Sequence, residues 1–568
     1  MNVRMKKGIA MMALLAVVLD GTQYQAYAKE SVAAVAQTTN VESDTTANLK
    51  VYKASGTVTE KKYSSVEKGY VTPVESQKDT QLCWAYAFCA AMEISAKKQG
   101  LGTYNLSEYQ VGYLTYAKEH LMDGGTDTIQ LTGKNWSNAG GNTVYILSKL
   151  SQGYTIKEES GLNATSLTDV TYEKCLGDGV LSLGDAYRAY YHDLNNVKSA
   201  IKESGSVIAP MTIPLQCYDV QHASLCTDKI YRENGHEVTI VGWNDSFPKE
   251  NFGKVKPEKD GAWLCKNSWG TLFGQNGYFW ISYEDYGLNY YGNIFGVTAT
   301  RPDTRMVYGY DGGYSHRFIP FYQDTVGCEF VADQDLAISG IKFAIMSSTD
   351  EVINVRILKN ISKDHQYGDL IYNGFYQHKQ KSGYLNFNFK NVYLTKGTKY
   401  FVVLNGASNL EIETQKAATD GINSNDITIN SDFSGNSYIY ADDKWIKANE
   451  SVEANGNDIC LRVCASPVTH DVAKKNESPV LNEYPGIKKI KKQKGSVVLS
   501  WEKSDTAKKY DIYRKTGAKG KYKKIATVKK TKYVDKHSLK KGKKYYYIVT
   551  AVDEGGYEYE SDPKVIKY

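Results

Sequence analysis

The sequence lacks any long hydrophobic run. A helix that spans a bilayer needs about 20 consecutive apolar residues, whereas the apolar run from Ile9 to Leu19 holds only 11. That run follows the basic segment Arg4 to Lys7 and is closed by Ala26 to Ala28, a small-x-small triplet typical of a cleavage site. We therefore predict a secretory signal peptide at residues 1–28 and an exported chain without a transmembrane anchor.

The nine cysteines include no Cys-x-x-Cys pair, and no histidine clusters beside them. Because zinc sites need such clusters, we expect no metal, and we predict no cofactor. An odd number leaves at least one thiol of an exported chain unpaired, which makes it a candidate nucleophile. Cys217 and Cys226 could bridge a short loop, whereas Cys460 and Cys464 are as easily core residues of a strand.

No excess of one charge marks the chain as a whole, since its formal net charge is only +6. The charge is uneven, however: residues 481–568 hold 24 Lys plus Arg against 10 Asp plus Glu, a balance of +14 that leaves −8 for the rest. Such a basic segment could bind anionic wall polymers, acidic lipids or nucleic acid, or be merely a soluble lysine-rich β face. We predict no specific nucleic-acid partner, and a monomer.

A chain of 568 residues is too long for a single hydrophobic core, which rarely exceeds about 250 residues, so several domains are expected. Residues 29–66 have the composition of a flexible leader. Residues 67–300 mix helical and strand patterns, and residues 301–465 alternate short apolar runs with turns, as in a β-sandwich. Residues 466–485 resemble a linker, and residues 486–568 alternate like a second small sandwich.

A helix is predicted from Cys83 to Lys98, and it is apolar nearly all round, so it should be buried. Asp79 and Thr80 suit its start, while two lysines and Gly100 suit its end. Cys83 would then lie at the positive end of the helix dipole. Cys89, in the same helix, and Cys265 are best interpreted as core residues.

Three separated motifs carry the groups that a nucleophilic thiol requires. Gln77 precedes Cys83-Trp84-Ala85-Tyr86 by six residues, Gly235-His236-Glu237 lies downstream, and Asn267-Ser268-Trp269-Gly270 comes last. The intervals from Cys83 to His236 and from His236 to Asn267 are 153 and 31 residues. In order and spacing these motifs resemble the papain family of cysteine peptidases.

The resemblance implies an α+β, two-lobed catalytic domain at residues 67–300. It makes Cys83 the nucleophile and His236 the general base and later the acid, oriented by Asn267. Gln77 and the Cys83 backbone N–H would stabilise the oxyanion. Trp269 would shield the His–Asn hydrogen bond.

The resemblance also implies substrate-binding positions. Gly140 and Gly141 match the glycine strip that binds the substrate backbone. Glu237 would lie near the second substrate residue and favour Lys or Arg there; alternatively, it points to solvent or pairs with a neighbouring base. Thr80-Gln81-Leu82 replaces the usual Cys-Gly-Ser, so the disulfide to the glycine-strip loop is absent and that loop is expected to be more mobile.

Two further resemblances concern the β regions. Residues 301–465, with Val307 to Asp311 and Gly383 to Leu385, resemble the lectin-like domain of secreted, mostly clostridial, peptidases, where it binds sugars or serves as a spacer. Residues 486–568, with Trp501 and the alternating strand at 545–551, resemble a fibronectin type III domain.

The leading hypothesis is therefore a secreted cysteine peptidase, an endopeptidase more than an exopeptidase, that hydrolyses proteins or peptides through an acyl-enzyme outside a bacterial cell. It would be free or associated with the cell wall, with wall or host glycans as candidate ligands of the lectin-like domain. The alternative is a catalytically silent adhesin that binds glycans or host proteins. A transglutaminase or wall-peptide hydrolase would lack the Gln and Asn-Ser-Trp-Gly elements.

Overall fold

The computed structural model describes residues 57–568, apart from short internal gaps. The gaps are residues 119–120, 122–127, 132–134, 191–192, 232–234, 292, 312–315, 319–324, 346–349, 380–381, 407–410, 415–426, 431–432, 451–455, 555 and 557. The predicted signal peptide and the leader up to residue 56 lie outside the described residues. Among the described residues, no helix has the length and apolar character needed to cross a bilayer.

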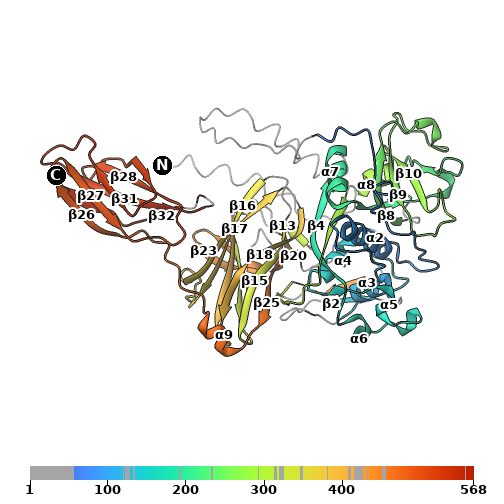
Figure 1. The fold of residues 1–568 in the computed structure, drawn as a ribbon, viewed down its shortest axis with the longest axis horizontal. Coiled ribbons are helices and arrows are strands. Elements are labelled where there is room, and N and C mark those ends of the chain that lie inside the picture. Colours follow the sequence, from blue (N-terminus) through green and yellow to red (C-terminus); the bar gives the residue numbers. More distant parts are fainter. Residues whose placement is uncertain are drawn as a thin grey trace.

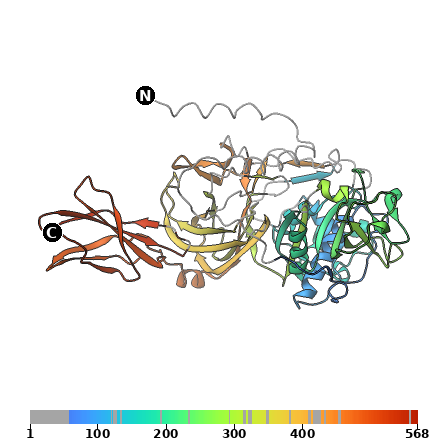
Figure 2. The ribbon, with the colours of Figure 1, turned by 90° about the horizontal axis from the view of Figure 1, so that it is seen from above.

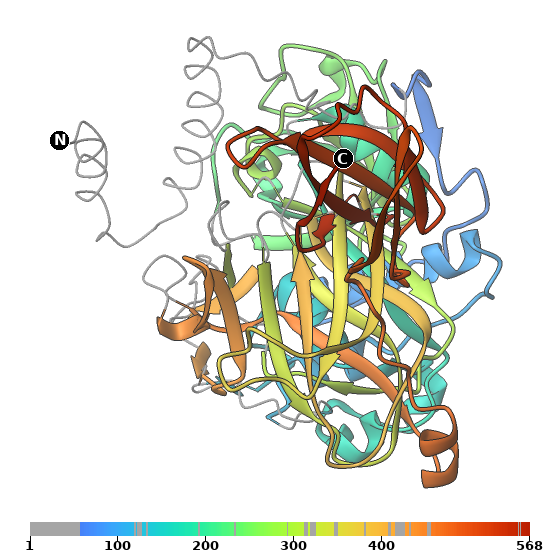
Figure 3. The ribbon, with the colours of Figure 1, turned by 90° about the vertical axis from the view of Figure 1, so that its left-hand side faces the viewer.

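Three bodies follow one another along the molecule (Figure 1). We call them the N-terminal domain (residues 57–300), the middle domain (residues 301–485) and the C-terminal module (residues 486–568). The view from above shows the same succession (Figure 2), and the C-terminal module lies in front when the molecule is seen from its end (Figure 3).

The N-terminal domain has helices mainly in its first half and strands in its second. Its elements are β1 (Lys62–Ser64), α2 (Cys83–Lys98), α3 (Glu108–Thr115), β2 (Thr128–Leu131), α4 (Thr143–Leu150), β3 (Thr155–Ile156), α5 (Glu159–Leu162), α6 (Tyr172–Cys175), β4 (Leu181–Tyr190), α7 (Leu194–Ser204), β5 (Val207–Thr212), β6 (Tyr218–Asp219), β7 (Ser224–Leu225), β8 (Gly235–Asn244), β9 (Ala262–Lys266), β10 (Tyr278–Ser282), α8 (Tyr286–Tyr291) and β11 (Asn293–Thr300).

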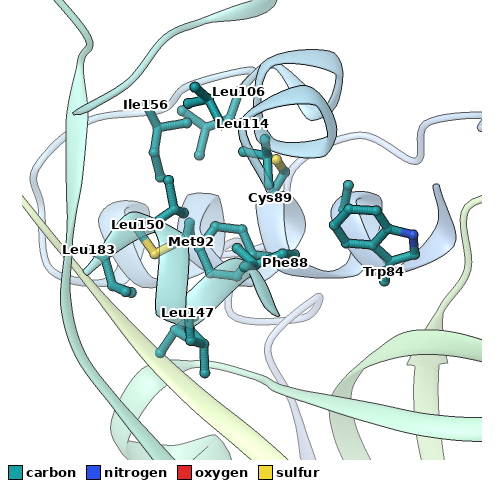
Figure 4. Packing of buried hydrophobic residues seen from close by; sticks show 14 of the residues in the cluster. Trp84, Phe88, Cys89, Met92, Leu106, Leu114, Leu147, Leu150, Ile156 and Leu183 are labelled. Atoms are coloured by element: carbon teal, nitrogen blue, oxygen red, sulfur yellow. The ribbon is translucent and has the colours of Figure 1, made fainter. Parts of the chain in front are cut away.

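Helix α2 begins and ends where the sequence pattern places it, and its apolar side chains are buried. Figure 4 shows Trp84, Phe88 and Met92, spaced one turn apart, in one cluster with Leu147 and Leu150 of α4. The prediction for the start of the helix was wrong in detail, because the N-cap is Leu82 and no side chain caps the helix. The Thr80 hydroxyl instead donates to the Gln77 carbonyl (2.7 Å), which leaves the first N–H groups of α2 available to the neighbouring site.

Strand β1 shows that the expected leader ends earlier than residue 66. Lys62 to Ser64 pair antiparallel with Asn244 to Gly242 of β8, and the Trp243 indole donates to the Glu60 carbonyl (3.0 Å). Tyr63 also stacks on Trp243, with ring centroids 4.9 Å apart. These residues therefore belong to the sheet of the N-terminal domain.

The middle domain is built from strands. They are β12 (Met306–Tyr308), β13 (His316–Phe318), β14 (Thr325–Val331), β15 (Leu336–Ile345), β16 (Asp350–Lys359), β17 (Asp369–Lys379), β18 (Ser382–Leu394), β19 (Lys399–Asn405), β20 (Glu411–Thr414), β21 (Ile427–Asn430), β22 (Ser437–Ala441), β23 (Lys444–Lys447), β24 (Gly456–Ile459) and β25 (Leu461–Pro467).

Two large sheets of the middle domain enclose a buried apolar core that includes Phe343, Val355 and Val402. One sheet has the order β17-β16-β19-β14-β22-β23. The other, β12-β25-β15-β18, continues through a β18–β4 pairing into the sheet of the N-terminal domain, which gives one sheet of 14 strands. Main-chain hydrogen bonds thus cross the boundary between the two domains.

The segment predicted as a linker, residues 466–485, is packed against the middle domain. It contains helix α9 (His470–Lys475), and the Leu481 N–H donates to the Leu370 carbonyl (2.7 Å). Glu483 forms an ion pair of 2.6 Å with Arg356 of β16. Composition alone indicates turns here, whereas these contacts fix the segment in place.

The C-terminal module has two sheets around a core that includes Trp501 and Tyr547. Its strands are β26 (Ile487–Gln493), β27 (Ser496–Trp501), β28 (Lys509–Thr516), β29 (Lys523–Val528), β30 (Lys532–Asp535), β31 (Lys544–Val552), β32 (Glu558–Glu560) and β33 (Lys564–Lys567). One sheet is β26-β27-β30 and the other contains β28, β29 and β31 to β33. The finer assignment to the fibronectin type III class stays a prediction.

Candidate active site

His236 and Asn267 meet because they lie on neighbouring antiparallel strands. His236 is near the start of β8, and Asn267 directly follows the end of β9, which pairs with β8. His236 Nε2 lies 2.7 Å from Asn267 Oδ1, and this oxygen also accepts the Ser268 N–H at 2.8 Å. Since Oδ1 acts as the acceptor, Nε2 must carry the proton, and Nδ1 keeps a lone pair for a proton from another group.

Trp269 covers this hydrogen bond. Its ring centroid lies 4.8 Å from that of the His236 imidazole at an interplanar angle of 44°. Phe273 packs edge-on against the indole, with ring centroids also 4.8 Å apart. Both His236 and Asn267 are buried, so water has little access to their contact.

Cys83 is the first residue of α2, and α2 packs on β8. The Thr239 hydroxyl of β8 donates to the Ala87 carbonyl (3.0 Å), which fixes the helix against the strand. The backbone N–H groups of Glu237, Trp84 and Cys83 lie near the Cys83 sulfur, and each of them lowers the pKa of the thiol. The thiol is therefore held beside the residue that follows His236.

Burial sets the ionisation of the two reactive groups taken one at a time. It raises the pKa of the Cys83 thiol to about 12, although the three backbone N–H donors oppose the shift. It lowers the pKa of His236 to about 4, against the hydrogen bond with Asn267. Transfer of the proton from sulfur to imidazole creates two opposite charges at once, and each charge stabilises the other. The pKa values of the separate groups therefore do not decide whether the thiolate–imidazolium pair forms.

Gln77 is held in one orientation by its neighbours. The Ser268 hydroxyl donates to Oε1 (2.7 Å), while Nε2 donates to the Thr80 carbonyl (2.8 Å). The Gln77 backbone N–H donates to the Ser268 carbonyl (2.8 Å). An amide nitrogen has two hydrogens, so the second N–H of Nε2 can donate to a developing oxyanion near Cys83.

Gly140 and Gly141 directly precede Asn142, the N-cap of α4, and Gly141 lies against Trp84. Gly141 has φ of +156°, and a Cβ there would come within 2.5 Å of the Trp84 indole, so no larger residue fits. The Tyr116 hydroxyl donates to the Gly140 carbonyl (2.6 Å), and the Gln81 N–H donates to the Ser137 carbonyl (2.8 Å). These contacts anchor the loop for which the absent disulfide led us to expect mobility.

Glu237 is buried rather than exposed to solvent, which excludes one alternative for its side chain. Its carboxylate accepts hydrogen bonds from the Thr143 hydroxyl (2.5 Å) and from the Thr143 N–H (3.2 Å) at the start of α4. A carboxylate at the positive end of a helix dipole is stabilised there. Thr143 escaped the sequence analysis, because no motif marks a threonine that follows the glycine strip.

A buried polar cluster beneath the site was also missed. The Lys266 amino group donates to the Thr72 hydroxyl (3.2 Å), which donates to Glu93 Oε2 (2.5 Å). Burial raises the pKa of Glu93 and of Glu108 and lowers that of Lys266, the residue before Asn267. The signal was present, since Glu93 is a carboxylate inside an otherwise apolar helix.

All nine cysteines are free, so Cys217 and Cys226 do not form a bridge. Cys89, Cys265, Cys460 and Cys464 are buried, as expected for core residues. The described residues contain no group of three or more His, Cys, Asp or Glu side chains placed to hold a metal ion.

Residues 59–293 match the family model described as papain family cysteine protease. This segment is therefore similar in sequence to the papain-family cysteine proteases. Cathepsin K of Mus musculus is 25% identical over 232 residues, which are 37% of this chain and 56% of that protein. Procathepsin L of Rattus norvegicus is 27% identical over 233 residues, which are 38% of this chain and 58% of that protein. The chain thus spans little more than half the length of these relatives.

Two solved structures of Cwp84 resemble this chain over more than the N-terminal domain. One, a clostridial cysteine protease after propeptide cleavage, is 22% identical with a TM-score of 0.59 and covers 72% of this chain and 99% of that one. The other contains the cysteine protease and lectin-like domains of Cwp84, a surface layer associated protein of Clostridium difficile; it is 20% identical with a TM-score of 0.59 and covers 80% of this chain and 98% of that one. The shared fold includes the lectin-like domain of Cwp84.

Proposed function

We propose that this protein is a secreted cysteine peptidase that hydrolyses peptide bonds with Cys83, His236 and Asn267. The observation that carries the proposal is the buried hydrogen bond from His236 Nε2 to Asn267 Oδ1. It fixes the tautomer and leaves Nδ1 free to accept a proton, while Cys83 lies at the start of the helix packed on the same strand. The orientation of Gln77 toward the same end of α2 supports the assignment of the oxyanion donors.

The proposed reaction assigns each step to a residue of this site. His236 Nδ1 takes the proton from the Cys83 thiol, and the thiolate attacks the substrate carbonyl. The oxyanion accepts hydrogen bonds from the Cys83 N–H and from Gln77 Nε2, worth about 3 kcal/mol per donor in comparable sites. His236 then protonates the leaving amine and activates the water that hydrolyses the acyl-enzyme.

Substrate binding is assigned to residues around Cys83 and His236. The Gly140 and Gly141 backbone would hydrogen-bond the substrate chain, because the absence of side chains permits close approach. Glu237 would favour Lys or Arg at the second substrate residue, and Trp269 would border the cleft beside His236. We propose endopeptidase action on proteins or peptides outside the cell, with the lectin-like domain as a spacer or a binder of wall or host glycans.

Peptide hydrolysis by the purified mature chain under reducing conditions tests this function. A mixed fluorogenic peptide library should be cleaved by the wild type and by Cys175→Ala, which removes a buried thiol of α6. Cleavage should be lost in Cys83→Ala and after treatment with a thiol-directed epoxide. If the folded wild type cleaves nothing and Cys83 does not react, the alternative of a catalytically silent adhesin takes its place.

A second proposal concerns attachment to the cell surface through the C-terminal module. Strand register places Lys489 opposite Ser500 and Ser500 opposite Lys532, while Lys491 lies opposite Val498. These three exposed lysines share the outward face of β26-β27-β30, because Val497 and Leu499 of the central strand point inward to the core. Neighbouring strands are about 4.8 Å apart, so the three lysines form one positive patch that would attract an anionic polymer of the cell wall.

A further inference from the structure

Arg462 of β25 belongs to the middle domain, yet its side chain is buried at the boundary with the protease domain. Its relative exposure is 1%, and that of its partner Asp311 is 0%. Nη2 lies 2.6 Å from Asp311 Oδ2 and Nε lies 3.1 Å from Oδ1, so the two groups form a two-point ion pair. The Tyr384 ring of β18 lies under the guanidinium at 5.5 Å.

The third nitrogen of the guanidinium, Nη1, contacts helix α4 of the N-terminal domain. Nη1 donates to the Ser148 carbonyl (3.3 Å) and to the Ser151 hydroxyl, at the C-terminal end of this helix. The carbonyl groups of a last helical turn lack partners within the helix and carry the negative end of its dipole. Arg462 therefore supplies both hydrogen bonds and a compensating charge across the domain boundary.

The opposite end of α4 is part of the active site. Asn142 caps the helix by accepting the Tyr145 N–H (3.2 Å), and Thr143 binds the carboxylate of Glu237. Glu237 follows His236, and Gly140 and Gly141 directly precede the cap. Eight residues of helix span about 12 Å, so one short rigid element joins Arg462 to the substrate strip.

Backbone pairing between strands also fixes the position of the N-terminal domain relative to the middle domain. Tyr384 of β18 pairs with Ala186 of β4, and Asn386 Nδ2 donates to the Gly184 carbonyl (2.7 Å). Strand β2, which comes before the glycine strip, pairs antiparallel with β21 of the middle domain, with Leu131 opposite Ile427. Arg462 thus acts on α4 from a fixed platform rather than from a domain on a tether.

We infer that Arg462 is a positioning residue of the peptidase site. By holding the end of α4, it sets the position of the glycine strip and of the Thr143–Glu237 contact beside His236. The inference rests on the proposed peptidase function and adds that the middle domain completes the protease domain. Because the strip binds the substrate backbone, loss of this support raises KM more than it lowers kcat.

A double variant tests the inference without leaving a buried charge unpaired. Asp311→Leu/Arg462→Met replaces the ion pair by apolar side chains, an exchange that proteins often tolerate. We expect kcat/KM for peptide substrates to fall at least tenfold, mostly through KM, and hydrogen exchange at residues 138–150 to accelerate. The matched control Arg356→Met/Glu483→Leu removes a different ion pair of the middle domain, between β16 and the segment 466–485, and its kcat/KM should stay within twofold of the wild type.

Two gentler variants cover the case in which the double variant does not fold. Arg462→Lys keeps the charge but loses the fork of donors, and Ser151→Ala removes one acceptor on the α4 side; each should raise KM about threefold. Unchanged KM and unchanged exchange at residues 138–150 in folded variants would overturn the inference. If the wild type proves inactive, the peptidase proposal fails, whereas the exchange measurement still decides whether Arg462 holds α4.

Discussion

The hydroxyl of Thr143 donates a 2.5 Å hydrogen bond to the carboxylate of Glu237. This contact joins the residue after the proposed catalytic histidine to the start of α4, and so connects β8 to α4 within the N-terminal domain. Both side chains are buried, and the carboxylate also accepts the Thr143 N–H. The position of β8 relative to the glycine strip therefore depends on a side chain that no motif includes.

Thr143→Val should impair the enzyme without disturbing the helix, because valine has the shape of threonine but cannot donate. Loss of one hydrogen bond to a buried carboxylate costs about 2 kcal/mol in the free energy of unfolding. We expect kcat/KM to fall by roughly tenfold, because a small displacement of the glycine strip relative to His236 would place the substrate less well for attack. Thr115→Val is the matched control, because Thr115 is a buried helical threonine whose hydroxyl donates only to the Val111 carbonyl. Equal effects of the two substitutions on kcat/KM would contradict this role of Thr143.

The charge of Glu237 should affect which peptides are hydrolysed fastest. Peptides with Arg at the second residue before the cleaved bond should be hydrolysed faster than those with Leu, and Glu237→Gln should reduce the ratio by several-fold. Two hydrogen bonds from Thr143 compensate part of the charge, so we expect a preference rather than an absolute requirement. Equal cleavage of both peptides, unchanged in Glu237→Gln, would refute the assignment.

Ser268 should act through Gln77. Its hydroxyl holds Gln77 Oε1 at 2.7 Å, and without it the amide can rotate away from the oxyanion. Ser268→Ala is expected to lower kcat by about tenfold with little change in KM, whereas Gln77→Ala should cost about a hundredfold in kcat because the donor itself is lost. Ser65→Ala removes another buried hydroxyl, which lies 2.5 Å from the Gly205 carbonyl and 3.4 Å from the Tyr63 hydroxyl, and should leave kcat unchanged. An effect of Ser268→Ala on KM alone would argue against the oxyanion role.

The sequence was sufficient for those parts of the protein that depend on local pattern. The bounds of α2 follow from its largely apolar composition and from the lysines and glycine at its end, and the strands around Ile341 and Val402 follow from alternation and turn residues. The proximity of His236 and Asn267 was expected only from the resemblance of their motifs to the papain family, and not from local pattern. Outside those motifs, no pattern indicated which side chains approach one another.

Contacts between distant segments could not be predicted. Glu60, Tyr63 and Lys62 lie in a stretch of polar composition, and only pairing with β8 makes it part of a sheet. Arg462 gave no signal either, because an arginine in a strand is usually exposed, and its burial depends on Asp311 and on the end of α4. Such positions are set by tertiary packing rather than by propensity.

The pKa of His236 predicts a stability change with pH. Its folded-state pKa of about 4 lies below the ordinary value of 6.5, so the unfolded chain binds the proton more tightly. The stabilising contribution is present above pH 6.5 and is lost as the pH falls toward 4, by about 3 kcal/mol in total. The measurement is denaturant unfolding of Cys83→Ala, where no thiol can share the proton, against Cys83→Ala/His236→Gln as the reference. Stability curves that stay parallel between pH 7 and pH 4 would show that burial does not depress this pKa.

The lysine face of the C-terminal module should confer binding that weakens with salt. Lys489, Lys491 and Lys532 share one outward face by strand register, and each polymer phosphate that they neutralise releases a counterion. Replacing all three with Gln should weaken binding of the full chain to poly(glycerol phosphate) at least tenfold at low salt and flatten the plot of log affinity against log salt. Replacing Lys519, Lys521 and Lys523 removes the same charge from exposed positions before and at the start of β29, which belongs to the other sheet of the module, so it separates a placed face from net charge alone. If both triple variants lose affinity equally, the module is only a diffuse polycation, and the face has no special role.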